Sequence, residues 1–154
     1  SDILQNVGMS ANNMGKVEVG FWEIEKIIGK FAGDNKDFLD KVEFVVGVSR
    51  GGLVPAALLA AKIDKPLAAA YINKQDEIFF DRGEWIAGKN VLVVDDVIRS
   101  GKTLWLVKNH LQKCCRPKSI SFFVLFKVKS LQNEDYRIQS FSREIDEDVV
   151  FPWD

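Results

Sequence analysis

Residues 91–103 run Val-Leu-Val-Val-Asp-Asp-Val-Ile-Arg-Ser-Gly-Lys-Thr, an apolar strand that leads into two adjacent carboxylates and a small, hydroxyl-rich turn. Helical periodicity follows the turn, so the backbone N–H groups of residues 100–103 should face an anion at a helix N-terminus. Asp95 and Asp96 are suited to hold ribose hydroxyls and a divalent cation. An ordinary buried strand before a capped helix is the plainer alternative. The combination favours a site for a sugar phosphate, in which sugar and phosphate share one loop.

The ending Gly101-Lys102-Thr103 also occurs in the nucleotide-binding P-loop, and the spacing decides against that motif. A P-loop needs a glycine five residues before its Gly-Lys pair. Asp96 stands at that position here. The wide, glycine-started cradle therefore cannot form.

A second anion site is predicted at residues 44–60, Phe-Val-Val-Gly-Val-Ser-Arg-Gly-Gly-Leu-Val-Pro-Ala-Ala-Leu-Leu-Ala. Its first five residues suit a strand buried on both faces, and residues 53–62 suit an apolar helix. Between them, glycines at 51 and 52 allow close approach of the backbone to a ligand, and Arg50 brings a permanent charge to a diphosphate. A tight turn without a ligand is the alternative, and the acidic block at 95–96 favours the site.

Together the two blocks resemble the phosphoribosyl pyrophosphate signature and the pyrophosphate loop of the type I phosphoribosyltransferases, nearest the xanthine-guanine and hypoxanthine branch. Residues 149–154, Val-Val-Phe-Pro-Trp-Asp, are similar to the segment beside the purine in that branch. The resemblance implies an α/β fold, a mostly parallel twisted sheet flanked by helices with a small hood or lid region, in one domain over residues 1–154. It implies transfer of ribosyl 5-phosphate from phosphoribosyl pyrophosphate to a nucleobase, a 6-oxopurine by preference.

The resemblance also assigns roles to residues of this sequence, and it implies a cis peptide between Ser49 and Arg50. The predicted catalytic residues are Asp95, Asp96 and Arg99. The predicted binding residues are Ser100, Gly101, Lys102 and Thr103 for the 5-phosphate, Ser49, Arg50 and Gly51 for pyrophosphate, and Lys127, Val149 and Asp154 for the base. Mg²⁺ would enter with the donor, with Asp95 and Asp96 as weak direct ligands.

Two residues depart from the purine-specific pattern. Arg99 stands where those relatives have an aspartate near the purine N7, and a guanidinium cannot accept a proton. Asp148 stands where they have an aromatic ring that stacks on the base, a contact worth about 1–3 kcal/mol elsewhere. Two alternatives therefore stay open: a regulatory protein that binds a phosphoribosyl ligand with little or no turnover, or a transferase for a different acceptor.

The composition agrees with the expectation of a cytoplasmic enzyme domain. Hydrophobic residues make up 47% of the 154 residues, enough for a core, and a formal net charge of −1 argues against nucleic acid as a partner. No membrane span and no signal peptide are expected from the sequence, and a homo-oligomer is expected. The adjacent Cys114 and Cys115 are expected to be free thiols.

The hydrophobic pattern predicts helices over 18–32, 52–62 and 101–113 and strands over 43–48, 67–72, 91–95, 119–126 and 135–139. Residues 71–85 are predicted to form two short strands or a loop that closes over a ligand. The order is mostly strand, helix, strand, typical of parallel sheets.

Overall fold

The computed structural model describes residues 10–11, 16–129, 140–146 and 148–154. Its main sheet has the strand order β5-β4-β3-β6-β7-β8. All neighbours in this sheet are parallel except the β4–β5 pair at one edge. The strands are β3 (Phe44–Val48), β4 (Leu67–Ile72), β5 (Ile78–Phe80), β6 (Asn90–Ile98), β7 (Ser119–Val128) and β8 (Ser140–Ile145). The predicted fold class, a mostly parallel sheet flanked by helices, is confirmed.

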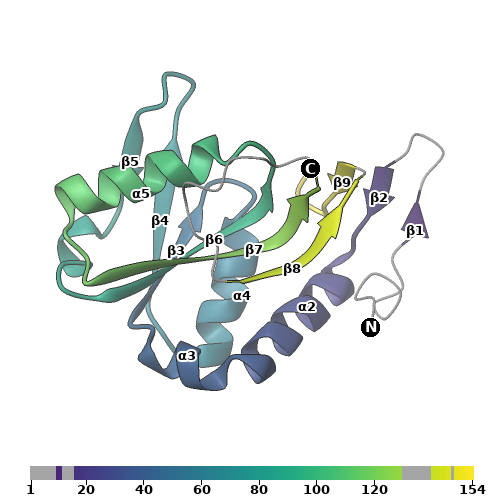
Figure 1. The fold of residues 1–154 in the computed structure, drawn as a ribbon, viewed down its shortest axis with the longest axis horizontal. Helices are drawn as coiled ribbons and strands as arrows, with labels where there is room; N and C mark the ends of the chain where they lie inside the picture. Colours follow the sequence, from purple (N-terminus) through teal and green to yellow (C-terminus); the bar gives the residue numbers. More distant parts are fainter. Residues whose placement is uncertain (1–9, 12–15, 130–139, 147) are drawn as a thin grey trace.

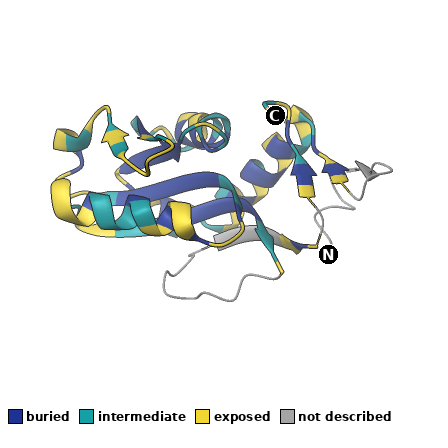
Figure 2. Ribbon diagram, turned by 90° about the horizontal axis from the view of Figure 1, so that it is seen from above, coloured by how far each residue is buried: buried dark blue, intermediate teal, exposed yellow. Residues whose placement is uncertain are grey.

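Helices cover both faces of this sheet (Figure 1). One face packs against α2 (Phe21–Asp34), α3 (Lys36–Lys41) and α4 (Leu53–Ile63), and the other against α5 (Lys102–Cys114). Alternate strand residues point to opposite faces, so Leu92 and Val94 join the first core and Val91 and Val93 the second. The central strands are consequently buried on both sides (Figure 2).

A second, three-stranded sheet stands beside the carboxyl ends of the main strands, in the order β1-β2-β9 (Figure 1). It is built from β1 (Ser10–Ala11), β2 (Lys16–Glu18) and β9 (Asp148–Val150), with β2 and β9 parallel. The helix predicted over 18–32 therefore starts too early. Residues 16–18 pair with β9 instead, and the helix begins at Phe21, after Gly20.

The other predicted elements lie within a few residues of their observed positions. Residues 71–85 form the end of β4, a turn, β5 and the 3₁₀ helix η1 (Gly83–Trp85), so this segment contains one complete short strand, which pairs with the end of β4. The six-residue α3 was not predicted, and the strand predicted over 135–139 lies outside the described residues. In the part of the chain that the structure describes, no helix is both long and apolar enough to cross a membrane.

Candidate active site

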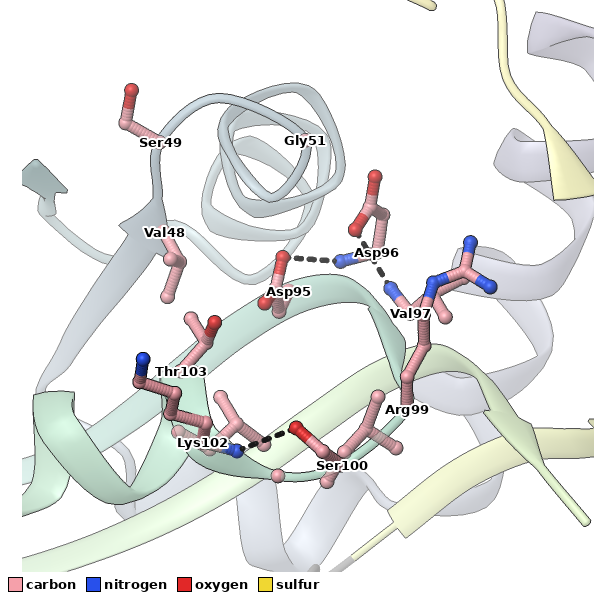
Figure 3. Close-up of a pocket in the computed structure, with 13 residues that line it drawn as sticks. Val48, Ser49, Gly51, Asp95, Asp96, Val97, Arg99, Ser100, Lys102 and Thr103 are labelled. Carbon is pink, nitrogen blue, oxygen red and sulfur yellow. Dashed lines mark hydrogen bonds between the residues drawn. The ribbon is translucent and has the colours of Figure 1, made fainter. Parts of the chain in front are cut away.

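The carboxyl end of β6 brings the two acidic residues to a cavity of about 360 Å³. The cavity is lined by residues 95–104 together with Val48, Ser49 and Gly51. Because β3 and β6 are parallel neighbours, the loops that follow them meet at the same edge of the sheet. Figure 3 shows Asp95 and Asp96 between the loop that carries Ser49 and Gly51 and the turn that carries Ser100 and Lys102. Residues of the two motifs predicted from sequence thus line one cavity.

Asp95 is the buried acid of the pair, with 9% of its surface exposed. Its Oδ1 accepts a hydrogen bond from the backbone N–H of Asp96 at 2.8 Å. Burial, and secondarily the neighbouring charge of Asp96, raise the pKa of Asp95 well above its usual value, although the backbone hydrogen bond acts in the opposite direction. A ligand that supplies hydroxyl donors or a cation would stabilise the ionised form of a carboxyl in this position.

Asp96 is held by two donors from different parts of the chain. Its Oδ1 accepts the backbone N–H of Val97 at 2.7 Å, and its Oδ2 accepts the indole N–H of Trp153 at 3.1 Å. The carboxylate also rests on Gly51, where a Cβ atom would lie only 2.0 Å from Oδ2. Asp96 therefore connects the end of β6, the loop after β3 and the C-terminal segment.

The turn after β6 has the geometry of an anion site at a helix N-terminus. Gly101 has a φ of 86°, which favours glycine, and α5 begins at the next residue. The backbone N–H of Lys102 points to Ser100 Oγ at 3.3 Å. The ammonium group of Lys102 pairs with Asp76 at 2.9 Å, which links this turn to the β4–β5 hairpin. All the predicted 5-phosphate residues, including Thr103, line the cavity.

The loop after β3 contains the predicted cis peptide between Ser49 and Arg50. Gly52 is packed against the strands, since a Cβ atom there would lie 2.4 Å from the carbonyl oxygen of Val94. Ser49 and Gly51 line the cavity, whereas the exposed Arg50 does not. Two of the three predicted pyrophosphate residues thus share the cavity with the acids.

The predicted base-binding residues lie apart from this cavity lining. Lys127 is near the end of β7, with its ammonium group 3.8 Å from Glu144. Val149 is buried in β9. Asp154 accepts the backbone N–H of Phe151 at 2.9 Å and so closes the C-terminal turn.

The two residues that depart from the purine-specific pattern pair with each other. Arg99 Nη1 donates to Asp148 Oδ1 at 2.6 Å, which joins the turn after β6 to β9. Both side chains are more than half exposed, at 54% and 61%. Their 49-residue separation offers no local signal of the contact, so the sequence alone presents them as two independent departures.

Among the described residues, no group of three or more His, Cys, Asp or Glu side chains is placed to hold a metal ion. Asp95 and Asp96 offer the hard oxygen ligands that Mg²⁺ prefers, and their number suits an ion bound mainly through a substrate. Trp153 is the residue of this site that sequence reasoning missed. Its sequence context is typical of a core or interface aromatic, and nothing local marks it as a partner of Asp96.

Comparison with known proteins agrees with this geometry. A family model described as "Phosphoribosyl transferase domain" matches residues 22–154. A xanthine-guanine phosphoribosyltransferase from Cereibacter sphaeroides is 32% identical over 120 residues, which cover 71% of this chain and 68% of that protein. The transcriptional regulator GfcR from Methanococcus maripaludis is also 32% identical, over 117 residues that cover 70% of this chain and 57% of the regulator.

A solved structure extends the similarity to the whole fold. The purine phosphoribosyltransferase from Pyrococcus horikoshii superposes with a TM-score of 0.79 at 28% sequence identity, covering 92% of this chain and 95% of that one. The paired acids, the two loops that line the cavity with them and the parallel sheet thus occur together with a family match over most of the chain. The chain belongs to the phosphoribosyl transferase domain family, and within it to the type I phosphoribosyltransferases, which are pentosyltransferases.

Proposed function

We propose that this protein transfers the ribosyl 5-phosphate group of phosphoribosyl pyrophosphate to a ring nitrogen of a 6-oxopurine and releases pyrophosphate. The observation that carries the proposal is the single cavity that Asp95 and Asp96 share with the turn at the start of α5 and with the loop after β3. A ligand with a ribose between two phosphate-bearing ends matches this order of groups.

On the donor side, each group of the ligand has a counterpart in the chain. The backbone of residues 100–103 would receive the 5-phosphate at the N-terminus of α5. Asp95 and Asp96 would accept hydrogen bonds from the ribose hydroxyls, and Ser49, Gly51 and nearby Arg50 would receive the leaving pyrophosphate. Held in this way, the ribose has its anomeric carbon between leaving group and acceptor, so that positioning supplies much of the catalysis.

In the reaction, the bond between the anomeric carbon and the pyrophosphate oxygen breaks, and its electrons leave with pyrophosphate. A new bond forms to the purine nitrogen, which loses its proton to water because Arg99 cannot accept one. The negative charge of Asp95 and Asp96 favours the positive charge that develops on the ribose. Asp95 and Asp96 are the residues that would hold Mg²⁺, as weak ligands beside the donor, and the ion would supply positive charge to stabilise the leaving pyrophosphate.

On the acceptor side, the proposal rests on the family resemblance of three residues. Lys127 would donate to the 6-oxo group, main-chain atoms of Val149 would contact the purine edge, and Asp154 would accept from a purine N–H. The xanthine-guanine and purine phosphoribosyltransferases among the relatives support this choice of acceptor. A cytoplasmic homo-oligomer is part of the same proposal.

A regulatory role for the same site is the second candidate. It is favoured by the Arg99–Asp148 ion pair, which stands where purine-specific relatives have an acid and a stacking ring. It is also favoured by similarity to a transcriptional regulator at 32% identity. In this case a phosphoribosyl ligand binds and little or no pyrophosphate is released.

The test combines ligand binding with turnover. Calorimetric titration with phosphoribosyl pyrophosphate and Mg²⁺ measures donor binding, and pyrophosphate release is followed with guanine, xanthine, hypoxanthine, adenine, orotate and uracil. Release that depends on a 6-oxopurine supports the proposed reaction, and release with another base identifies a different acceptor. Binding without release with any base supports regulation. No donor binding would reject the assigned site.

A further inference from the structure

The indole of Trp153 reaches one of the two acids from the C-terminal end of the chain. Its Nε1–H donates to Asp96 Oδ2 at 3.1 Å, across 57 residues of sequence. The other oxygen of the same carboxylate is taken by the backbone N–H of Val97. Two donors from different segments therefore determine the orientation of Asp96, and each oxygen retains a lone pair for a ligand.

Trp153 is itself held in place by the core. Its ring stacks on Phe151, with the centroids 4.8 Å apart and the planes 6° from parallel. Phe151 is buried and contacts Phe126 of β7 at a centroid distance of 6.0 Å. Asp154 closes the turn that contains both rings: its side chain accepts a hydrogen bond from the backbone N–H of Phe151, and its own backbone N–H donates to the carbonyl of Phe151. The indole is thus a rigid donor rather than a mobile surface group.

We infer that Trp153 is a positioning residue for the donor sugar: it orients the Asp96 carboxylate toward the ribose hydroxyls. This inference rests on the proposed function and adds a residue to it. Without the indole N–H, Oδ2 loses its fixed donor, and the carboxylate can rotate away from the hydroxyls. The contribution should be seen with ligands that carry the ribose and should be absent with inorganic pyrophosphate, which has no hydroxyls of this kind.

The experiment uses Trp153→Phe, which keeps a ring to stack on Phe151 and removes the N–H. Trp22→Phe is the matched control, since Trp22 is an exposed tryptophan on α2 outside the cavity lining. Dissociation constants are measured by calorimetry for phosphoribosyl pyrophosphate and for inorganic pyrophosphate, both with Mg²⁺. The same titrations are made in an Asp96→Ala background, and the donor and base KM values are measured where turnover is found.

The inference predicts that Trp153→Phe raises the dissociation constant of phosphoribosyl pyrophosphate about tenfold, as expected for the loss of one hydrogen bond to a charged group. Pyrophosphate affinity should not change, the donor KM should rise without a rise in the base KM, and Trp22→Phe should resemble the wild type. In the Asp96→Ala background, the tryptophan change should have no further effect, because its partner is already gone.

Three results would overturn the inference. The first is unchanged affinity for phosphoribosyl pyrophosphate in a folded Trp153→Phe protein. The second is an equal decrease in the affinities for phosphoribosyl pyrophosphate and inorganic pyrophosphate. The third is a decrease in donor affinity in the Asp96→Ala background as large as the decrease in the wild-type background. If the phenylalanine variant does not fold, Trp153→Met keeps an apolar side chain on Phe151 and tests the same hydrogen bond. A wild-type protein that binds neither ligand would instead reject the proposed function, so the two failures are distinguishable.

Discussion

Replacing Gly51 with alanine should disable the site while leaving the fold intact. The added Cβ would lie 2.0 Å from Asp96 Oδ2 and 2.4 Å from its Cγ. Since Cβ contacts below about 3 Å essentially do not occur, the carboxylate must move by roughly 1 Å or more. That movement breaks or strains its hydrogen bonds from Val97 and Trp153. The acid that we assign to the ribose would then be displaced.

The stability cost should be moderate, because a side-chain end can move and a backbone cannot. Overpacking costs about 1–3 kcal/mol, and we expect the lower half of this range, a decrease in Tm of about 2–8 °C. Donor affinity should fall more than tenfold. Gly52→Ala provides the contrast, because its Cβ would meet the carbonyl oxygens of Val94 at 2.4 Å and Val48 at 2.8 Å, which are fixed in the sheet. That variant should lose more stability.

Thermal unfolding followed by circular dichroism, and calorimetric titration with the magnesium-bound donor, provide the measurements. Gly33→Ala is the control, since Gly33 lies in α2 and a Cβ atom added to it would have nothing within 4 Å. Alanine there should leave donor binding unchanged and stabilise the helix by about 0.5–1 kcal/mol. A Gly51→Ala protein with wild-type donor affinity would refute the contact between Gly51 and Asp96 as a determinant of the site.

Three further predictions concern charges around the cavity. Burial raises the pKa of Asp95 above the usual 3.8, so the folded state binds this proton more tightly and stability falls as pH rises through the raised pKa. Asp95→Asn should therefore be more stable than the wild type in metal-free urea unfolding at pH 7, and this advantage should disappear below pH about 4. Arg99→Asp alone places a second negative charge beside Asp148 and should slow turnover of purines. The double variant Arg99→Asp with Asp148→Tyr instead supplies the acid and the stacking ring found in purine-specific relatives. Steady-state rates of that double variant on guanine or xanthine should exceed the wild type by at least about tenfold, the low side of general-base effects. Asp76→Asn releases the ammonium group of Lys102 and removes a negative charge near the phosphate turn. Donor affinity should rise several-fold at low salt, with the difference lost at high salt in the same titration.

Much of the site could be predicted because its signals are local in the sequence. Each anion loop is a continuous run in which strand, turn and helix follow one another, so the residue types define both the element and the ligand. The strand, helix, strand pattern predicts a mostly parallel sheet but not that β3 and β6 are neighbours, because β4 and β5 lie between them in the sequence. The family resemblance, rather than strand topology, implies that Ser49 and Asp96 serve one ligand, and both line the same cavity although they are 47 positions apart.

The contacts made by the C-terminal segment could not be predicted in the same way. Trp153 meets Asp96, and Asp148 meets Arg99, through chain reversals that no hydrophobic period encodes. The pairing of β2 with β9 could not be predicted either, because three residues are too few to display an alternation and the last of them, Glu18, falls within the predicted helix. The family resemblance implies that this segment lies beside the base, and it does not reveal the contact between Trp153 and Asp96.

Arg99 and Asp148, the two residues that depart from the purine pattern, form an ion pair and so affect the site together. A lone arginine would attract the phosphates, and a lone aspartate would repel them, but at 2.6 Å their charges largely cancel. Both side chains are more than half exposed, and an exposed ion pair of this kind contributes only about 0.2–1 kcal/mol. An acceptor that forms even one good hydrogen bond can displace it at that cost. The pair is therefore too weak to lock the site against turnover. Arg99 and Asp148 replace the proton acceptor and the stacking ring of purine-specific relatives. The expected consequence is a slower reaction or a different acceptor rather than a closed cavity.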